Sequence, residues 1–214
     1  MTDDQKRWLV AGIALNKILV PQIRSFVEQE VGKEYNNLKS SHTIHIQTKP
    51  HYLKAWPTSK DFLKYENINC NDGLPKVKKH GKYVYDYNSF NYQVTSHVDF
   101  ARLFVQNYMA KFTAFDDHCD TSAVLQLLLR IPAFSSAVQT AADNVRKTRN
   151  DWAHCGFNKW DQPNFSRSFS DMEQLVKSLA LPVAGKILGE LKDWETKGNY
   201  FSIYWNHLFA ICYQ

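Results

Sequence analysis

Apolar residues recur at helical spacing near both ends of the chain, and this periodicity constrains the fold more than any other feature. In residues 2 to 35, a Thr2-x-x-Gln5 capping pattern precedes apolar positions that fall on one face of a helix: Leu9, Ile13, Val20, Ile23 and Val27. Pro21 interrupts the pattern, because proline lacks a backbone N–H and its ring clashes with the preceding turn. We therefore expect a kinked helix, or two consecutive helices, in this region.

Helical patterns return after residue 96. Apolar residues at helical spacing cover 97–113, and "TSAVLQLLLRI" predicts a short apolar helix that stops at Pro132. We expect the next helix over about 136–155, followed by a loop, "GFNKWDQPNF". Ser170-x-x-Glu173 is a second capping pattern, from which we expect a long helix with a bend at Pro182. The sequence therefore predicts an all-α helical bundle.

Residues 36–96 have a different character from the rest. They are rich in polar, aromatic and His residues, and they contain three prolines and the turn signal Asn71-Asp72-Gly73. We expect an irregular, loop-rich insertion here. The last residues, "YFSIYWNHLFAICYQ", are dense in aromatics, which predicts a tail packed on the bundle or on a partner. Because one hydrophobic core serves chains of up to ~250 residues, we expect a single domain over 1–214.

Composition limits the class of protein and the compartment. With 44% hydrophobic and 22% charged residues, the chain can bury a core and reads as soluble and globular. The net charge of +5 is compatible with a polyanionic partner but does not identify one. The four cysteines form no CxxC pair, the first residues are polar, and no apolar run approaches the ~20 residues that span a bilayer. We expect a reducing compartment, the cytosol or nucleus, with a cytoplasmic location favoured and no membrane partner.

An arginine interrupts the apolar stripe of the helix expected over 136–155. At ~100° per residue, one sector of that helix holds Val138, Ala142, Val145, Arg149 and Trp152. A guanidinium does not lose its proton to escape burial, so Arg149 must be paired, reach water at a groove, or face an anion. The position therefore needs an explanation beyond packing.

Two polar residues accompany this arginine. Asn150 and His154 are four positions apart and lie one turn from each other, whereas Arg149 and His154 point ~140° apart. Gly156 predicts the helix end, which places His154 in the last turn. The helix dipole favours the imidazolium form there, which makes His154 a useful proton donor.

Arg149, Asn150 and His154, with four residues between the arginine and the histidine, resemble the motif of the HEPN superfamily of endoribonucleases. "TSAVLQLLLRI", "AADNVRKTRNDWAHC" and "FSDMEQLVKSLA" are similar to the helix, motif helix and following helix of the animal HEPN group that includes a zinc-finger-associated ubiquitin ligase. "RWLVAGIALNKILVPQIRSFVEQEV" resembles the opening of an uncharacterised animal HEPN family. Together these segments cover 63 of the 214 residues. The insertion at 36–96 and the tail have no such likeness.

The resemblance implies metal-independent cleavage of RNA, without a cofactor, by attack of the 2′-hydroxyl on the adjacent phosphate. It also implies a site shared between the motif helices of a homodimer. In that site Arg149 would bind the phosphate oxygens, His154 would move a proton as base or acid, and Asn150 would orient His154 or donate to the phosphate. The alternative is a catalytically silent HEPN module that binds RNA or a protein partner in innate immune or stress signalling.

Other interpretations of these residues remain open. Arg149 can be a structural arginine paired with a carboxylate such as Asp151, and His154 can simply cap the helix. The neighbours His118-Cys119 and His154-Cys155 suggest zinc, but adjacent helical residues point ~100° apart, so we expect no metal site.

Basic residues add candidate RNA contacts. Arg146 and Lys147 precede the motif, and the run "PKVKKHGKY" supplies Lys76, Lys78 and Lys79. Lysines in such a run bind phosphates in some proteins and form a solvated loop in others.

Overall fold

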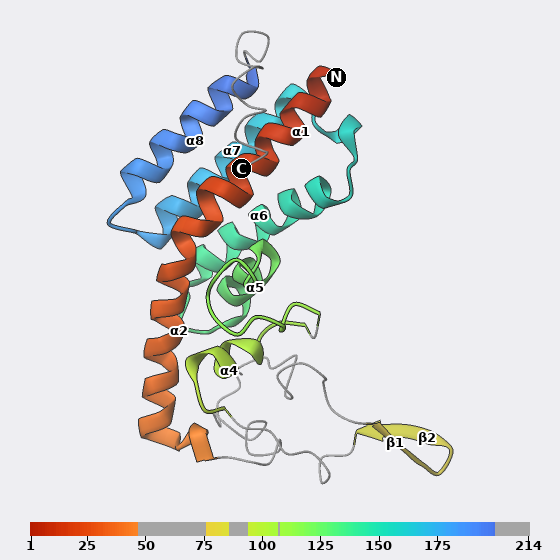
Figure 1. The fold of residues 1–214 in the computed structure, drawn as a ribbon, viewed down its shortest axis with the longest axis vertical. Coiled ribbons are helices and arrows are strands. Elements are labelled where there is room, and N and C mark those ends of the chain that lie inside the picture. Colours follow the sequence, from red (N-terminus) through yellow and green to blue (C-terminus); the bar gives the residue numbers. More distant parts are fainter. Residues whose placement is uncertain (47–75, 86–93, 107, 200–214) are drawn as a thin grey trace. The chain divides into compact units, whose positions relative to one another are not determined.

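The structure is a computed structural model that describes residues 1–46, 76–85, 94–106 and 108–199 (Figure 1). It is predominantly helical, which confirms the expected all-α class with a loop-rich region. The chain divides into two compact units, one made of Met1–Ile23 with Thr140–Gln214 and the other of Arg24–Gln139. The expectation of a single domain stays a prediction.

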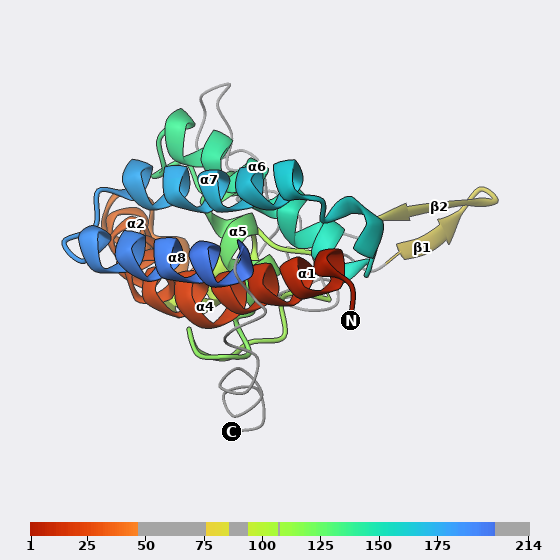
Figure 2. The same ribbon diagram turned by 90° about the horizontal axis from the view of Figure 1, so that it is seen from above.

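The first unit is built on three helices that lie side by side (Figures 1 and 2): α1 (Asp3–Ile13), α7 (Gln162–Leu179) and α8 (Ala184–Asn199). It also contains the π-helix η1 (Ala14–Leu19), the first residues of α2 (Val20–His42), most of α6 (Ser136–Ala153) and the short 3-10 helix η3 (Phe157–Lys159). Its core is apolar and fully or nearly fully buried, and includes Val10, Leu15, Phe165, Phe169, Met172, Val176, Ile187 and Leu191.

The N-terminal helix begins where the sequence predicts. The Thr2 hydroxyl accepts a hydrogen bond from the backbone N–H of Gln5 at 3.3 Å, and the Gln5 side chain accepts one from the Thr2 backbone at 2.9 Å. The winding changes shortly before Pro21: Ala14–Leu19 form the π-helix η1, and Pro21 is the second residue of α2. Pro21 has no N–H for the Lys17 carbonyl and crowds that carbonyl, so wider winding relieves the clash. The chain stays helical to His42, beyond the expected end at 35.

This continuity changes one expectation about membranes. Asp3–Ser41 forms a helical stretch of 39 residues with a window of mean hydropathy 1.2, long and apolar enough to cross a bilayer by length and composition. Of that window, 56% is buried inside the protein, as in the core helix of a globular fold. The stretch is not an unbroken apolar run in the sequence, since polar residues such as Asn16 and Lys17 interrupt it.

The C-terminal helices differ from the prediction at two points. Helix α7 begins at Gln162 and not at Ser170, because the Asp161 side chain accepts from the backbone N–H of Asn164 at 2.9 Å and Pro163 suits the first turn. The expected bend at Pro182 is a break between two helices. Ala180 adopts a left-handed φ of 50°, which ends α7 and reverses the chain before α8.

The second unit contains the rest of α2, η2 (Ile44–Ile46), strands β1 (Lys76–Lys79) and β2 (Lys82–Tyr85), α4 (His97–Arg102), α5 (Thr121–Arg130) and the start of α6. Helix α5 ends before Pro132 as expected, and its residues from Thr121 to Leu128 are all buried. Polar contacts tie α2 to this unit: Glu28 pairs with His97 at 3.1 Å, and Arg24 with Asp117 at 2.8 Å.

The helix expected over 97–113 is mostly absent. Helix α4 ends at Arg102, whose Nε donates to the Ala110 carbonyl at 2.8 Å across an irregular turn. The apolar residues Phe100, Leu103, Phe104 and Phe112 are nevertheless fully buried. The spacing of these apolar residues therefore indicated correctly that they are buried, but not that they form a helix.

Part of the insertion is more regular than expected. Strands β1 and β2 pair as an antiparallel hairpin, in which Lys79 is opposite Lys82. His80 and Gly81 form its two-residue turn with φ values of 50° and 78°, the positive pair that such turns require. The segments 47–75 and 86–93, and the expected aromatic tail from 200 onward, lie outside the described residues.

Candidate functional site

Helix α6 carries the predicted motif on a partly buried surface. Val138, Ala142 and Val145 are buried, and the stripe continues through Arg149 and Trp152, which are both half-buried. The stripe expected from the sequence is therefore present, and Arg149 lies at the point where it emerges from the core.

The end of α6 is capped differently from the prediction. The backbone N–H of His154 still donates to the Asn150 carbonyl at 3.1 Å, so His154 closes the last turn. Cys155, and not Gly156, takes the left-handed conformation, with a φ of 51°. Gly156 has a φ of −76° and opens η3.

Aromatic packing anchors this end of α6 on α1. The rings of Trp152 and Trp8 stack with centroids 5.7 Å apart, and the Trp8 indole donates to the Trp152 carbonyl at 2.8 Å. Phe157 packs edge-on against Trp8 at 5.1 Å. Gly12 makes the approach possible, because a Cβ there would clash with the Trp152 indole. The backbone that carries His154 is therefore held in place.

The Arg149 guanidinium has no ion pair or hydrogen bond with any residue in the described ranges. Asp151, the partner suggested by the sequence, instead pairs with the Lys159 ammonium at 2.7 Å. The structural-arginine interpretation based on Asp151 is therefore wrong.

Asn150 and His154 do not join Arg149 in one cluster. His154 is exposed, Asn150 is half-buried, and within the described part of the chain only their backbones are hydrogen-bonded to each other. The helix directs Arg149 and His154 ~140° apart. Within one chain, the three motif residues are neighbours in sequence without facing a common point.

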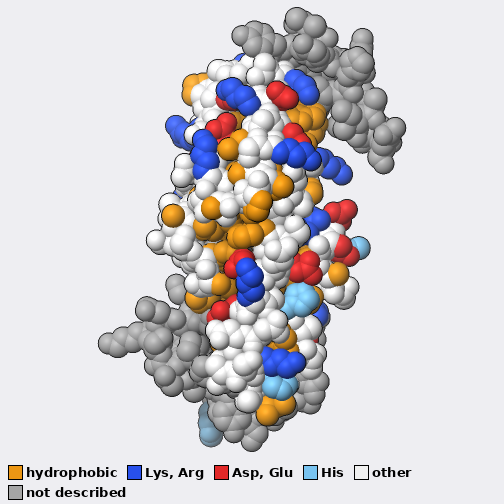
Figure 3. All heavy atoms as spheres, turned by 90° about the vertical axis from the view of Figure 1, so that its left-hand side faces the viewer, with side chains coloured by type: hydrophobic (Ala, Val, Ile, Leu, Met, Phe, Trp, Pro, Cys, Tyr) orange, Lys and Arg blue, Asp and Glu red, His pale blue; other side chains and the backbone are white. Residues whose placement is uncertain are grey.

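The basic residues before the motif are partly neutralised. Asp143 binds Arg146 at 2.6 Å and Lys147 at 2.8 Å. Both contacts lower the pKa of the Asp143 carboxyl, and the contact with Lys147 has the larger effect. Lys78 and Lys79 are exposed on the hairpin of the other unit. Lys76 begins the same hairpin, but its side chain is not among the described side chains. On the face in Figure 3, basic and acidic side chains are interspersed among the described residues.

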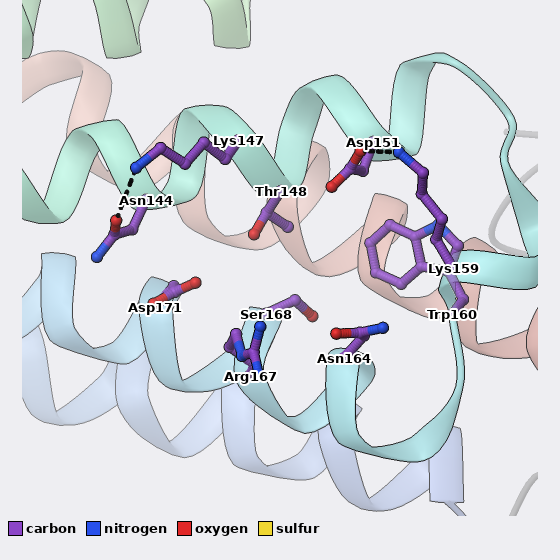
Figure 4. A pocket seen from close by; sticks show the side chains of 10 residues that line it. All are labelled: Asn144, Lys147, Thr148, Asp151, Lys159, Trp160, Asn164, Arg167, Ser168 and Asp171. Carbon is purple, nitrogen blue, oxygen red and sulfur yellow. Dashed lines mark hydrogen bonds and ion pairs between the residues drawn. The ribbon is translucent and has the colours of Figure 1, made fainter.

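A pocket of about 450 Å³ lies between α6, η3 and α7 (Figure 4). Of the predicted site residues, only Lys147 lines it. The full lining is polar apart from one indole: Asn144, Lys147, Thr148, Asp151, Lys159, Trp160, Asn164, Arg167, Ser168 and Asp171.

A sequence signal for this pocket exists and was missed. Polar residues occupy positions i, i+3, i+4 and i+7 on α6, at 144, 147, 148 and 151, and the same spacing recurs on α7 at 164, 167, 168 and 171. Each set marks one face of its helix. Only the packing of the two helices reveals that these faces meet.

The pocket is lined by both basic and acidic side chains. Burial raises the pKa of the Asp171 carboxyl, while the nearby charges of Arg167 and Lys147 act in the opposite direction. Trp160 is 3% exposed, and its indole N–H is buried without a hydrogen-bond partner among the described residues.

The two His-Cys neighbours are not joined by further candidate metal ligands among the described residues. His118 is exposed beside Asp116, whereas Cys119 is buried, which raises the pKa of its thiol to about 12. No cluster of three or more His, Cys, Asp or Glu residues suited to a metal ion occurs in the described ranges.

Comparisons of this chain with protein-family models, with curated proteins and with solved structures found no match.

Proposed function

We propose that the chain is a metal-independent endoribonuclease that cleaves RNA by 2′-hydroxyl attack, with a composite site at a homodimer interface. The observation that carries this proposal is the half-buried Arg149, which has no counter-ion among the described residues. A permanently charged guanidinium loses solvation when it is partly buried, and a bound phosphate would offset that cost.

The roles follow from the chemistry of each group. Arg149 would donate two hydrogen bonds to the phosphate oxygens, where negative charge grows as the 2′-oxygen attacks. The O2′–P bond forms and the P–O5′ bond breaks, which leaves a 2′,3′-cyclic phosphate and a 5′-hydroxyl. His154, exposed at the end of α6, would take the proton of the 2′-hydroxyl or give one to the leaving 5′-oxygen. Asn150 would orient one of these groups.

The divergence of the motif residues supports a shared site. Phosphate clamp and proton carrier must both come within ~3 Å of the reacting atoms, yet one helix points them ~140° apart. Two motif helices related by a two-fold axis would bring Arg149 of one protomer to His154 of its partner.

A specific observation favours the alternative, a catalytically silent module that binds RNA or a protein partner in immune or stress signalling. No side chain in the described part of the chain hydrogen-bonds to the His154 ring. Catalytic histidines usually have a partner that sets the tautomer and orientation. In the proposed dimer, that partner would come from the second protomer or from the RNA.

The decisive experiment incubates purified protein with end-labelled RNA in excess EDTA. We expect cleavage to persist, with products that end in a 2′,3′-cyclic phosphate and begin with a 5′-hydroxyl. RNA that is bound but never cut would support the silent module. Cleavage that EDTA abolishes and Mg²⁺ or Mn²⁺ restores would contradict the mechanism.

A further inference from the structure

The pocket between α6, η3 and α7 is separate from the proposed cleavage site. Its α6 residues centre about 150° around the helix from Arg149, and neither Arg149 nor His154 lines it. An inference from the pocket therefore stands apart from the cleavage proposal.

One part of the pocket is suited to an anion. Arg167 and Lys147, from α7 and α6, both lie close enough to Asp171 to act on its carboxyl, although Lys147 is also paired with Asp143 at 2.8 Å. Arg167 has no ion pair or hydrogen bond with a described residue, although it is one turn from Asp171 on the same helix. Figure 4 shows Arg167 and Asp171 close together on α7, with Lys147 on α6 across from them. An unpaired guanidinium beside a second cation is a typical partner for phosphate oxygens.

The Asp171 carboxyl is the acidic group beside these two cations. Its partial burial disfavours the charged form, which raises its pKa. In the protonated form the carboxyl donates a hydrogen bond and carries no charge. Only that form would hydrogen-bond to a phosphate oxygen, whereas the ionised form would repel it.

The rest of the pocket offers neutral and paired hydrogen-bonding groups. Thr148 lies on the α6 side and Asn164 on the α7 side, and Asp151 is held by Lys159 at 2.7 Å at the end where Trp160 lies (Figure 4). These groups suit hydroxyls, which both donate and accept. Trp160 is 3% exposed, so it has no open face on which a nucleobase would stack.

We propose that this pocket binds a small phosphorylated sugar, with the phosphate between Arg167 and Lys147 and the sugar hydroxyls against Asn164, Thr148 and Asp151. The volume of about 450 Å³ falls in the range of pockets that enclose small ligands.

Calorimetric titration of the full chain with ribose 5-phosphate tests the proposal. We expect saturable binding at one site per chain, at least about tenfold tighter than inorganic phosphate, because the sugar adds hydrogen bonds. Arg167→Gln should weaken binding about tenfold or more. Asp171→Asn should leave it unchanged or tighten it, since no carboxylate then faces the phosphate. The matched control is Lys177→Gln, which removes a charge from the exposed surface of α7 outside the pocket and should have no effect.

Three results would overturn the proposal. The first is the absence of saturable ribose 5-phosphate binding by a folded protein, and the second is binding that Arg167→Gln does not weaken. The third is a single-stranded RNA that binds and displaces ribose 5-phosphate, with an affinity that falls in Arg167→Gln, because the pocket would then be part of an RNA surface. None of these depends on cleavage, so failure here is distinguishable from failure of the proposed function.

Discussion

At the scale of single residues, the charge of Arg149 is the feature that packing does not explain. Most half-buried arginines are held by a carboxylate, and in this chain Asp143 holds Arg146 in that way, with Asp143 accepting at 2.6 Å. Arg149, three residues further along α6, has no such partner among the described residues. Its removal should therefore cost little stability and much activity if it binds a phosphate.

Arg149→Ala and His154→Ala should each lower the RNA cleavage rate by at least about 100-fold, the usual effect of removing a charge stabiliser or a proton carrier. The free energy of unfolding should change by less than about 1 kcal/mol, because Arg149 breaks no ion pair and His154 is exposed. Cleavage assays and urea denaturation measure the two effects.

Lys177→Ala is the control for a lost positive charge and should cleave as the unmodified chain does. A variant at Arg149 or His154 that cuts RNA at the original rate would remove that residue from the site. Loss of several kcal/mol of stability in Arg149→Ala would instead identify a structural arginine.

At the scale of elements, two capping signals compete for the start of α7. The pattern Ser170-x-x-Glu173 is present in the sequence, yet the helix begins eight residues before Ser170, at Gln162. Asp161 accepts from Asn164, and starting there buries Phe165 and Phe169 in the core of the first unit. The additional apolar burial favours the earlier start, because each fully buried Phe contributes roughly 1.5–3 kcal/mol.

Asp161→Ala should therefore lower the free energy of unfolding by about 1 kcal/mol, the typical cost of losing an N-cap. Ser170→Ala, in the exposed middle of α7, should change it by less than about 0.5 kcal/mol. Urea denaturation of both variants provides the comparison. A larger loss for Ser170→Ala than for Asp161→Ala would contradict the helix start.

At the scale of the whole molecule, the proposed activity requires two copies of the chain. Arg149 and His154 diverge on one helix, so we expect each active cleft to combine Arg149 of one protomer with His154 of its partner. A chain with Arg149→Ala still supplies His154, and a chain with His154→Ala still supplies Arg149.

Mixing these two inactive variants should restore cleavage, because a heterodimer rebuilds one of two composite sites. Each heterodimer should cleave at up to about half the rate of the original homodimer. Co-purification of the two variants, each carrying a different affinity tag, should confirm that heterodimers are present in the mixture. Verified heterodimers without activity, or full activity in a monomer, would exclude the shared site.

The sequence by itself determined the features that depend on neighbours along the chain. The Thr2 cap, the interruption at Pro21, the end of α5 before Pro132 and the apolar stripe of α6 all follow from local hydrogen bonding and the 3.6-residue period. The same helical period shows from the sequence alone that Arg149 interrupts this stripe.

Only the tertiary structure decided what depends on residues far apart in sequence. Burial selected Asp161 over Ser170, left the apolar residues after Arg102 in an irregular path, and kept Asp151 with Lys159 rather than Arg149. The same holds for the pocket, since two polar faces at matching spacing become a site only when α6 and α7 pack against each other. Periodicity reports which face of a helix is polar, but the partner of that face is chosen by long-range packing, which no local pattern encodes.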